Sequence, residues 1–220
     1  MSRLVAKIVH AFARDRGLPP AALARKAARN AAAYALATLA LRGCTKVGTR
    51  SRCFGRPRID ARGRIVIGDD FALACTFGTV LLAAGPGGAV TIGDGVTINY
   101  GSAVAAAKLV TIGDRVMIGP YCVIEDGDDP SLEDERQARP VVIEEDVWLA
   151  GRVVVRPGVR IGAGTVVAAG SVVETDLPAN ALASGSPARV LRVRDAGRPP
   201  ESGLRTLDIE AVEARRVAAR

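Results

Sequence analysis

The chain has 220 residues, of which 49% are apolar and 24% charged, so it can bury a sizeable core and is not intrinsically disordered. Aromatic residues make up only 4%, which indicates a narrow core built from small and branched aliphatic side chains. The single histidine, His10, excludes a metal site that takes two or three imidazoles from one chain, and we expect no metal cofactor.

Charge is distributed unevenly along the sequence. Residues 1–64 hold 15 Lys or Arg against 2 Asp or Glu, residues 65–188 hold 7 against 16, and residues 189–220 hold 8 against 5. A basic N-terminal arm therefore precedes an acidic body. We see neither a base-reading motif nor aromatic stacking residues in the arm, so the sequence does not predict nucleic-acid binding.

The N-terminal arm, residues 1–45, is predicted to be helical. Apolar residues recur at helical spacing over residues 1–12, Gly17, Pro19 and Pro20 interrupt the pattern, and an Ala-rich segment follows over residues 21–42. The longest uncharged stretch of that segment has 12 residues, against about 20 needed to cross a bilayer.

Two interpretations of the arm remain open at this point. It packs on its own body or on a sister subunit, or it contacts a membrane surface through cations beside the apolar stripe, namely Arg3, Lys7, Arg14 and Arg16. No secretory signal pattern is present, so we expect a cytoplasmic protein, with peripheral membrane contact as the alternative role of the arm.

A six-residue repeat dominates the next part, which we delimit as residues 46–192. Aliphatic residues recur every six positions, and a second column of small or aliphatic residues lies four positions after each of them. The first column in the clearest run is Ile143, Leu149, Val155, Ile161, Val167 and Val173, and the second is Val147, Val153, Val159, Thr165, Ser171 and Leu177. Residues two apart on an extended strand face the same way, so each hexad predicts a short strand with an apolar inner face.

The chain must therefore turn every six residues, as in a solenoid of stacked parallel strands. Glycine follows the first column repeatedly, and we predict that these corners need a positive φ. These glycines are Gly68, Gly93, Gly113, Gly119 and Gly162. The polar segment 126–140 is predicted to protrude as a loop, and GPGG at 85–88 is predicted to be a turn.

Four cysteines, Cys44, Cys53, Cys75 and Cys122, contain no C-x-x-C pair, and we expect them to be reduced. Cys122 lies in the inward column, where a thiol is normally inert.

The stretch from Pro140 to Arg192, together with TIGDGVTINYGS and TIGDRVMIGPY upstream, resembles the hexapeptide-repeat acyltransferases, in particular the maltose, galactoside and sugar O-acetyltransferases. The resemblance implies a mainly β fold, a left-handed parallel β-helix; to this the sequence itself adds the N-terminal helical segment and a C-terminal tail, residues 193–220, with a short helix near residues 207–217. The resemblance also implies acetyl-CoA as the acyl donor, a small-molecule or glycan acceptor and a homotrimer with sites between neighbouring copies.

In that family a histidine acts as general base on the acceptor. Laying the family's His-Pro pair on Asp129-Pro130 puts Asp129 in the place of the histidine, whereas laying its D-x-D-x-H form from Asp126 puts Pro130 there. We take Asp129 as the candidate base, since neighbouring acids raise the pKa of a carboxyl group toward that of a base. The alternative is that these acids form a solvated loop, and that the protein is a catalytically inactive assembly or ligand-binding partner.

The remaining candidate residues also come from the resemblance. Asn99 matches an asparagine that lines the acceptor pocket, or is a corner asparagine. Trp148 points outward by strand alternation and is predicted at a ligand wall or subunit interface. The other matched positions concern CoA: Gly151, Ala169 and Gly170 along the pantetheine arm, Thr175 in place of a phosphate-contacting lysine, and Arg189 and Arg192 at the nucleotide phosphates.

Each of these positions has a structural alternative. Gly151, Ala169 and Gly170 are also what tight stacking of coils requires. The two arginines are also consistent with a plain basic cap at the end of the column.

Overall fold

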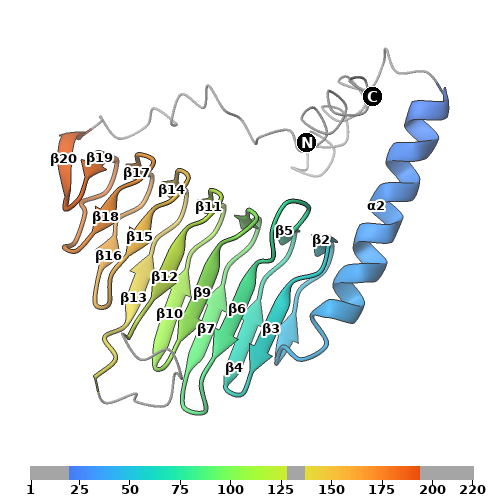
Figure 1. Cartoon of the computed structure of the whole chain (residues 1–220), viewed down its shortest axis with the longest axis horizontal. Helices are drawn as coiled ribbons and strands as arrows, with labels where there is room; N and C mark the ends of the chain where they lie inside the picture. Colours follow the sequence, from blue (N-terminus) through green and yellow to red (C-terminus); the bar gives the residue numbers. More distant parts are fainter. Residues whose placement is uncertain (1–19, 128–136, 194–220) are drawn as a thin grey trace, which may run out of the picture.

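The computed structural model describes residues 20–127 and 137–193, which form one long helix and a three-sided column of short strands (Figure 1). The chain passes through three sheets in turn, and each passage, which we call a rung, adds one strand to every sheet. We name them sheets A, B and C in chain order. The parallel β-helix predicted from the six-residue repeat is confirmed.

Sheets A and C each have six parallel strands, whereas sheet B has eight and ends in an antiparallel pair. Sheet A contains β1 (Lys46–Val47), β4 (Arg64–Ile67), β7 (Ala89–Ile92), β10 (Leu109–Ile112), β13 (Val141–Ile143) and β16 (Arg160–Ile161). Sheet B contains β2 (Arg52–Phe54), β5 (Ala72–Ala74), β8 (Thr97–Ile98), β11 (Met117–Ile118), β14 (Trp148–Leu149), β17 (Val166–Val167), β19 (Ala181–Gly185) and β20 (Ala188–Val193). Sheet C contains β3 (Arg58–Ala61), β6 (Leu81–Ala84), β9 (Ala103–Ala106), β12 (Val123–Glu125), β15 (Val154–Val155) and β18 (Val172–Val173).

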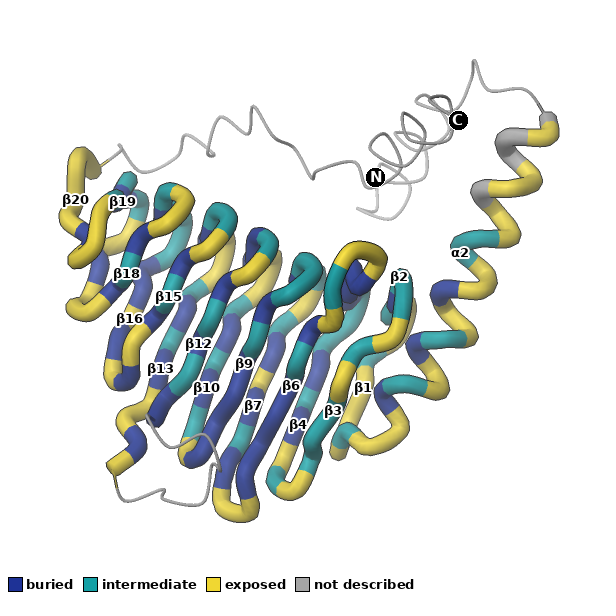
Figure 2. Tube along the Cα trace, viewed as in Figure 1, coloured by how far each residue is buried: buried dark blue, intermediate teal, exposed yellow. Residues whose placement is uncertain are grey.

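The residues at both predicted positions of the repeat fill the interior of the three-sided column of strands. Ile143, Leu149 and Val155 lie on successive strands of sheets A, B and C, and each is at most 1% exposed. Leu149 pairs in register with Val167, three hexads later. Figure 2 shows the resulting alternation of buried and half-buried residues along the strands, with the exposed residues gathered at the turns.

The turns stack into three edges, which we name by the sheets that they join. The AB edge contains residues 48–51, 68–71, 93–96, 113–116, 144–147 and 162–165. The BC edge contains residues 55–57, 75–80, 99–102, 119–122, 150–153 and 168–171. The CA edge contains residues 62–63, 85–88, 107–108, 126–127, 137–140, 156–159 and 174–176. GPGG lies on the CA edge and is a turn, as predicted, with Gly88 N donating to Gly85 O at 2.8 Å.

The glycines that follow the first column are needed for close approach between rungs, and the predicted positive φ is wrong for them. A Cβ on Gly93 would lie 2.9 Å from the backbone carbon of Gly113 in the next rung, which is closer than a real Cβ contact. The left-handed conformation occurs two residues later on the AB edge, at Gly95, Arg115 and their equivalents.

Many acids of the acidic body hold the AB edge together. Asp69 accepts from Thr49 N at 2.6 Å, Asp94 accepts from Asp69 N at 2.7 Å, and Asp114 accepts from Asp94 N at 2.8 Å. The successive carboxylates thus satisfy backbone donors that the turns leave unpaired. The backbone hydrogen bond from Thr49 lowers the pKa of Asp69.

The two ends of the column are covered by different elements. Helix α2 (Pro20–Ala40) packs its second half on β2 and adds Ala37 to the main core, together with Leu41 just after it. Its first half extends away from the strands (Figure 1). The antiparallel strand β20 covers the other end of sheet B. Among the described residues, no helix has the length and hydropathy of a membrane span.

Predicted elements outside the described residues are the helix over 1–12 and the helical tail over 193–220, apart from Val193 in β20.

Candidate active site

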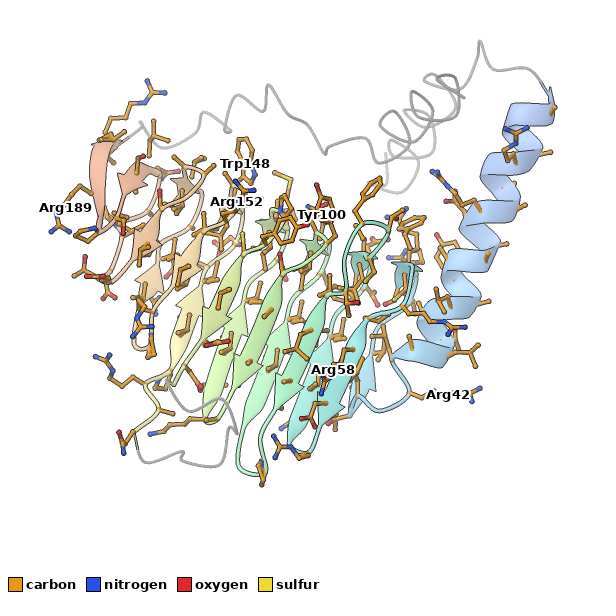
Figure 3. The ribbon with its side chains drawn as sticks, viewed as in Figure 1. Arg42, Arg58, Tyr100, Trp148, Arg152 and Arg189 are labelled. Atoms are coloured by element: carbon orange, nitrogen blue, oxygen red, sulfur yellow. The ribbon has the colours of Figure 1, made fainter. Side chains whose placement is uncertain are left out.

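The BC edge brings together most of the residues that the sequence singled out. Asn99 occupies its turn on the third rung, Gly151 on the fifth, and Ala169 and Gly170 on the sixth, and Trp148 lies on β14, just before the edge. Figure 3 shows Tyr100, Trp148 and Arg152 along this same side of the column, and Arg189 at its C-terminal end. Residues that are far apart in sequence therefore line one surface.

The side chain of Asn99 is half-buried and partly engaged. Its Nδ2 donates to Ile118 O at 2.9 Å, and its backbone N donates to the same carbonyl at 3.0 Å. Within the described residues, nothing donates to its Oδ1. The residue therefore supports the corner and also offers an acceptor oxygen at the surface of the edge.

Trp148 points outward, as strand alternation predicts. It is half-buried, whereas the next residue, Leu149, is fully buried. In register it lies between Met117 and Val166 on the outer face of sheet B. This outward row continues to Leu182 and ends at Arg192, so Trp148 and Arg192 lie on one line of side chains.

The small residues of the edge differ in the space around them. Gly170 has a φ of +74°, and a Cβ added there would meet no atom within 4 Å, so the space beside its backbone is open. Gly151 lies against Pro120, with the nearest contact of such a Cβ at 3.4 Å. Ala169 is exposed. These positions allow a ligand to approach the backbone closely, and tight rung stacking does not explain Gly170.

The predicted phosphate-contacting residues lie near the C-terminal end. Arg189 and Arg192 belong to β20 and are exposed, and Arg189 Nη1 donates to Ala188 O at 3.2 Å. Thr175 follows β18 and is exposed on the CA edge, so it is not on the edge that carries Gly151 and Gly170.

The acidic loop begins on the CA edge. Asp126 is fully buried there, and its carboxylate accepts backbone N–H groups from Ala107 at 2.7 Å and Lys108 at 2.8 Å, and from Leu109 as well. It is a structural residue that fixes the loop base. Asp129 lies outside the described residues. Because Asp126 lies on the CA edge, the loop departs from a different edge than the one that carries Asn99 and Trp148.

The four cysteines are free thiols, as expected. Burial raises the pKa of Cys53 to about 12 and those of Cys44 and Cys122 to about 11. A thiol with such a pKa is not a nucleophile at neutral pH. In the described part of the chain, no group of three His, Cys, Asp or Glu side chains could hold a metal ion.

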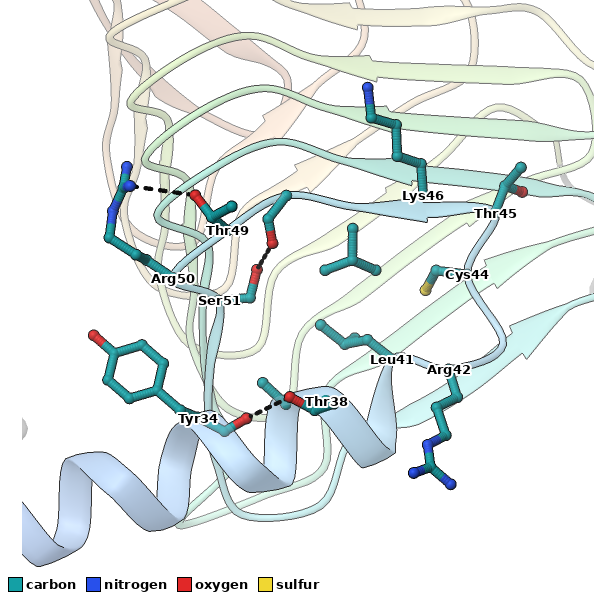
Figure 4. A pocket seen from close by; sticks show the side chains of 13 residues that line it. Tyr34, Thr38, Leu41, Arg42, Cys44, Thr45, Lys46, Thr49, Arg50 and Ser51 are labelled. Atoms are coloured by element: carbon teal, nitrogen blue, oxygen red, sulfur yellow. Dashed lines mark hydrogen bonds between the residues drawn. The ribbon is translucent and has the colours of Figure 1, made fainter.

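Two further features were not found from the sequence. A pocket of about 460 Å³ lies between the second half of α2 and the first rung, with Tyr34, Leu41, Cys44, Lys46 and Arg50 among its lining residues (Figure 4). It is formed by the packing of the helix, which no local pattern encodes.

The second feature is an aromatic ladder on the BC edge, formed by Phe77, Tyr100 and Tyr121 on three successive rungs. Ring centroids of neighbours are 5.4 and 5.5 Å apart in edge-to-face arrangement. The recurrence of an aromatic residue in the turn after β5, β8 and β11 could have revealed it.

The comparisons with known proteins agree with this architecture. Residues 140–175 match the bacterial transferase hexapeptide (six repeats) family. The chain is 38% identical over 108 residues to a galactoside O-acetyltransferase of Lactococcus lactis, covering 47% of this chain and 52% of the relative. The corresponding Escherichia coli enzyme is 35% identical over 111 residues, covering 48% and 55%.

Two solved structures are also similar. A hexapeptide-repeat acetyltransferase of Vibrio cholerae, complexed with acetyl coenzyme A, is 31% identical over 71% of this chain and 74% of its own, with a TM-score of 0.46. An N-acyltransferase of Bacillus cereus, in complex with dTDP-4-amino-4,6-dideoxyglucose and coenzyme A, is 19% identical over 83% and 95%, with a TM-score of 0.57.

The six-residue repeat, the stacked rungs and the similar proteins together define a left-handed parallel β-helix of the hexapeptide-repeat class. Residues 140–175 carry the bacterial transferase hexapeptide repeat, and over about half of its length the chain is similar to the galactoside O-acetyltransferases. It spans about half the length of the curated relatives that it matches.

Proposed function

We propose that the protein is an acyl-CoA-dependent acyltransferase that transfers an acetyl group to a hydroxyl or amine of a sugar or glycan-like acceptor. The observation that carries the proposal is the BC edge, where Asn99, Trp148 and Gly170 share one surface with a basic C-terminal end. The names of the galactoside O-acetyltransferase relatives support the same chemistry.

Acetyl-CoA is the donor in this proposal. Its pantetheine arm lies along Gly151, Ala169 and Gly170, where the open space beside Gly170 supports close backbone approach. Trp148 provides an apolar wall, and the guanidinium groups of Arg189 and Arg192 pair with the nucleotide phosphates. Thr175 is kept as a further donor-side candidate, although it lies on another edge.

Asp129 is the proposed general base, and Asn99 orients the acceptor. The carboxylate takes the proton of the acceptor hydroxyl or amine, whose oxygen or nitrogen attacks the thioester carbonyl. Backbone N–H groups stabilise the tetrahedral oxyanion, which collapses to the acetylated product and CoA thiolate. The thiolate then accepts the proton, so the base is restored.

A complete site of this kind requires two copies of the chain. Asn99 is on the BC edge and the loop that carries Asp129 begins on the CA edge, so the loop comes from a neighbour. The outer face of sheet C supplies an aliphatic surface for such a contact, and we propose a homotrimer. The outward row of that face is Leu81, Ala103, Val123, Val154 and Val172.

A second candidate function is a ligand-binding or assembly partner without catalysis. The observation that favours it is that the chain has one histidine, His10, and none in the loop where the family carries its base. Cytoplasmic location and peripheral membrane contact through the basic arm stay predictions.

The test is release of free CoA thiol from acetyl-CoA with a panel of mono- and oligosaccharides and amino sugars. We predict acceptor-dependent release that Asp129→Ala lowers at least about 100-fold, within the usual range for a general base. Asp129→His should retain or raise the rate at neutral pH. No release with any acceptor, while acetyl-CoA still binds, would favour the non-catalytic function. Unchanged turnover in Asp129→Ala would remove Asp129 as the base.

A further inference from the structure

The aromatic ladder is exposed to solvent in a protein that has few aromatic residues. Phe77 is 39% exposed and Tyr121 is 48% exposed, while Tyr100 between them is half-buried. Three of the chain's eight aromatic side chains therefore gather on one edge. A contiguous apolar surface of this kind is typical of an interaction site.

Tyr121 also occupies a backbone position that glycine favours. Its φ is 57°, and the same turn position of other rungs is held by Gly101, with φ 71°, and Gly170, with φ 74°. A bulky residue in the left-handed region is strained. Arg152, with φ 60°, holds the same position on the fifth rung, so the left-handed turn is a regular feature of this edge, and what distinguishes Tyr121 is a bulky ring that is nearly half exposed.

Gly101 makes room for the ring of Tyr121. A Cβ at Gly101 would lie 3.2 Å from Cγ of Tyr121 and still closer to the ring edge. The two neighbouring turns thus cooperate to hold the tyrosine ring over the edge, against Tyr100. The ladder is therefore a specific structural feature of the BC edge.

The ladder extends on both sides of the proposed acceptor residue Asn99, with Phe77 one rung before it and Tyr121 one rung after it, on the side of the proposed donor site. Asn99 immediately precedes Tyr100, and Gly151 and Gly170 lie on later rungs, whereas Phe77 lies one rung earlier. A single sugar ring at Asn99 does not span three rungs. The ladder follows the edge from rung to rung, which suits a ligand that extends along it.

We propose that the aromatic ladder is an extended acceptor subsite that binds an oligosaccharide or glycan chain by stacking of successive sugar rings on aromatic faces. The acceptor is then a chain, and its reacting sugar lies beside Asn99; this placement rests on the proposed acyltransfer. The C–H faces of pyranose rings pack on aromatic rings, and their hydroxyls remain in water.

A second copy of this chain is the other occupant to consider. The outer face of sheet C is a broader aliphatic surface for that purpose, spanning five rungs. The ladder is narrower, and exposed guanidinium groups flank it on its own edge, Arg56 on the first rung and Arg152 on the fifth. Polar flanks that interrupt the apolar surface favour a polar ligand such as a glycan.

Binding is measured first, by calorimetry without acetyl-CoA, on the full chain. The probes are α-1,4-linked glucose and β-1,4-linked N-acetylglucosamine oligosaccharides of one to five units. We expect affinity to rise over the first three units. Phe77→Ala and Tyr121→Gly should each weaken binding of the longer oligosaccharides by about fivefold to tenfold, and change monosaccharide binding by less than about twofold.

Tyr34→Ala is the matched control, because Tyr34 is an aromatic residue with 41% exposure on α2, away from the BC edge. It should leave oligosaccharide binding unchanged. Tyr121→Gly should keep or raise the melting temperature, because glycine removes the strain at this φ. This variant therefore separates loss of a ligand contact from loss of folding.

Turnover and light scattering complete the test. Chain-length-dependent binding that the ladder variants abolish supports the inference even where no CoA is released, and in that case only the proposed acyltransfer fails. Acyl transfer with equal kcat/KM for mono- and oligosaccharides, or no binding of either series, overturns the inference. Ladder variants that dissociate the oligomer would assign the ladder to a subunit contact and overturn it as well.

Discussion

Asp126 is an acid whose role follows from its hydrogen bonds. Its carboxylate accepts from three consecutive backbone N–H groups and is inaccessible to solvent. The sequence places it in a run of acids with Asp128 and Asp129, from which the resemblance selects Asp129 as the candidate base. Only the contacts separate a structural acid from a candidate base, because composition cannot say which carboxylate the backbone encloses.

We predict that Asp126→Asn lowers the free energy of unfolding by about 2–4 kcal/mol. The amide turns one acceptor oxygen into a donor facing backbone N–H groups and removes the charge that strengthens the remaining bonds. Chemical denaturation measures the effect, with Glu174→Gln, an exposed acid, as the control. A variant as stable as the native protein would contradict the structural role.

The buried thiols give a prediction on pH. Because burial raises the pKa of Cys122 to about 11, roughly 1 thiol in 1,000 is ionised at pH 8. We expect labelling by a thiol reagent at pH 8 to require unfolding, and to accelerate as the pH rises toward 11. Stoichiometric labelling of the native protein within minutes at pH 8 would contradict this environment.

The raised pKa of the buried thiols also makes the free energy of unfolding depend on pH. The folded state keeps the proton at a pH where the unfolded thiol, with a pKa near 8.5, has lost it. The contribution of Cys53 and Cys122 is therefore fully present below about pH 8.5 and is lost as the pH rises toward 11 to 12. This contribution to the free energy of unfolding should be smaller at pH 10 than at pH 7.5, and chemical denaturation at the two pH values measures the difference.

At the scale of elements, the six-residue repeat predicts the strands more fully than it predicts the individual turns. Strand existence and inward faces follow from period-two alternation, so Leu149 inward and Trp148 outward were both predictable. The reason for glycine at positions such as Gly93 was not predictable from the sequence, because the backbone that approaches Gly93 belongs to a residue 20 positions later. The capping of the first rung by α2 is likewise a tertiary contact.

Two glycines of the column should respond differently to alanine. Gly93→Ala places a Cβ 2.9 Å from the backbone of the next rung, and we expect a loss of about 1–3 kcal/mol in stability with an unchanged KM for acetyl-CoA. Gly170→Ala meets no atom within 4 Å, so it should cost only about 1–2 kcal/mol of backbone strain but raise that KM. Steady-state kinetics and denaturation curves separate the two. An unchanged KM in Gly170→Ala would place the donor elsewhere.

For the whole molecule, the proposed site implies an oligomer. The acidic loop and Asn99 occupy different edges, and the sequence could not predict this, since the hexads do not say which turn faces which. What the sequence did predict is the charge asymmetry of a basic arm on an acidic body, and contacts such as Asp94 with Asp69 N explain where much of the negative charge is used.

We predict that Val154→Asp, in the outward row of sheet C between Val123 and Val172, converts a trimer to monomers and abolishes acyl transfer. The substituted side chain points outward, so the monomer should remain folded. Thr91→Asp, on the outer face of sheet A, is the control and should remain trimeric. Light scattering measures both. A native monomer, or a trimer that survives Val154→Asp, would contradict the proposed subunit face.

A structure of the protein with bound coenzyme A is the decisive test of the proposed site. We predict that the pantetheine arm lies on the BC edge along Gly151, Ala169 and Gly170, beside Trp148, with the nucleotide phosphates at Arg189 and Arg192 and the thiol near Asn99. Coenzyme A seated on another face of the column, or no binding at millimolar concentration, would show that the donor site is not on this edge.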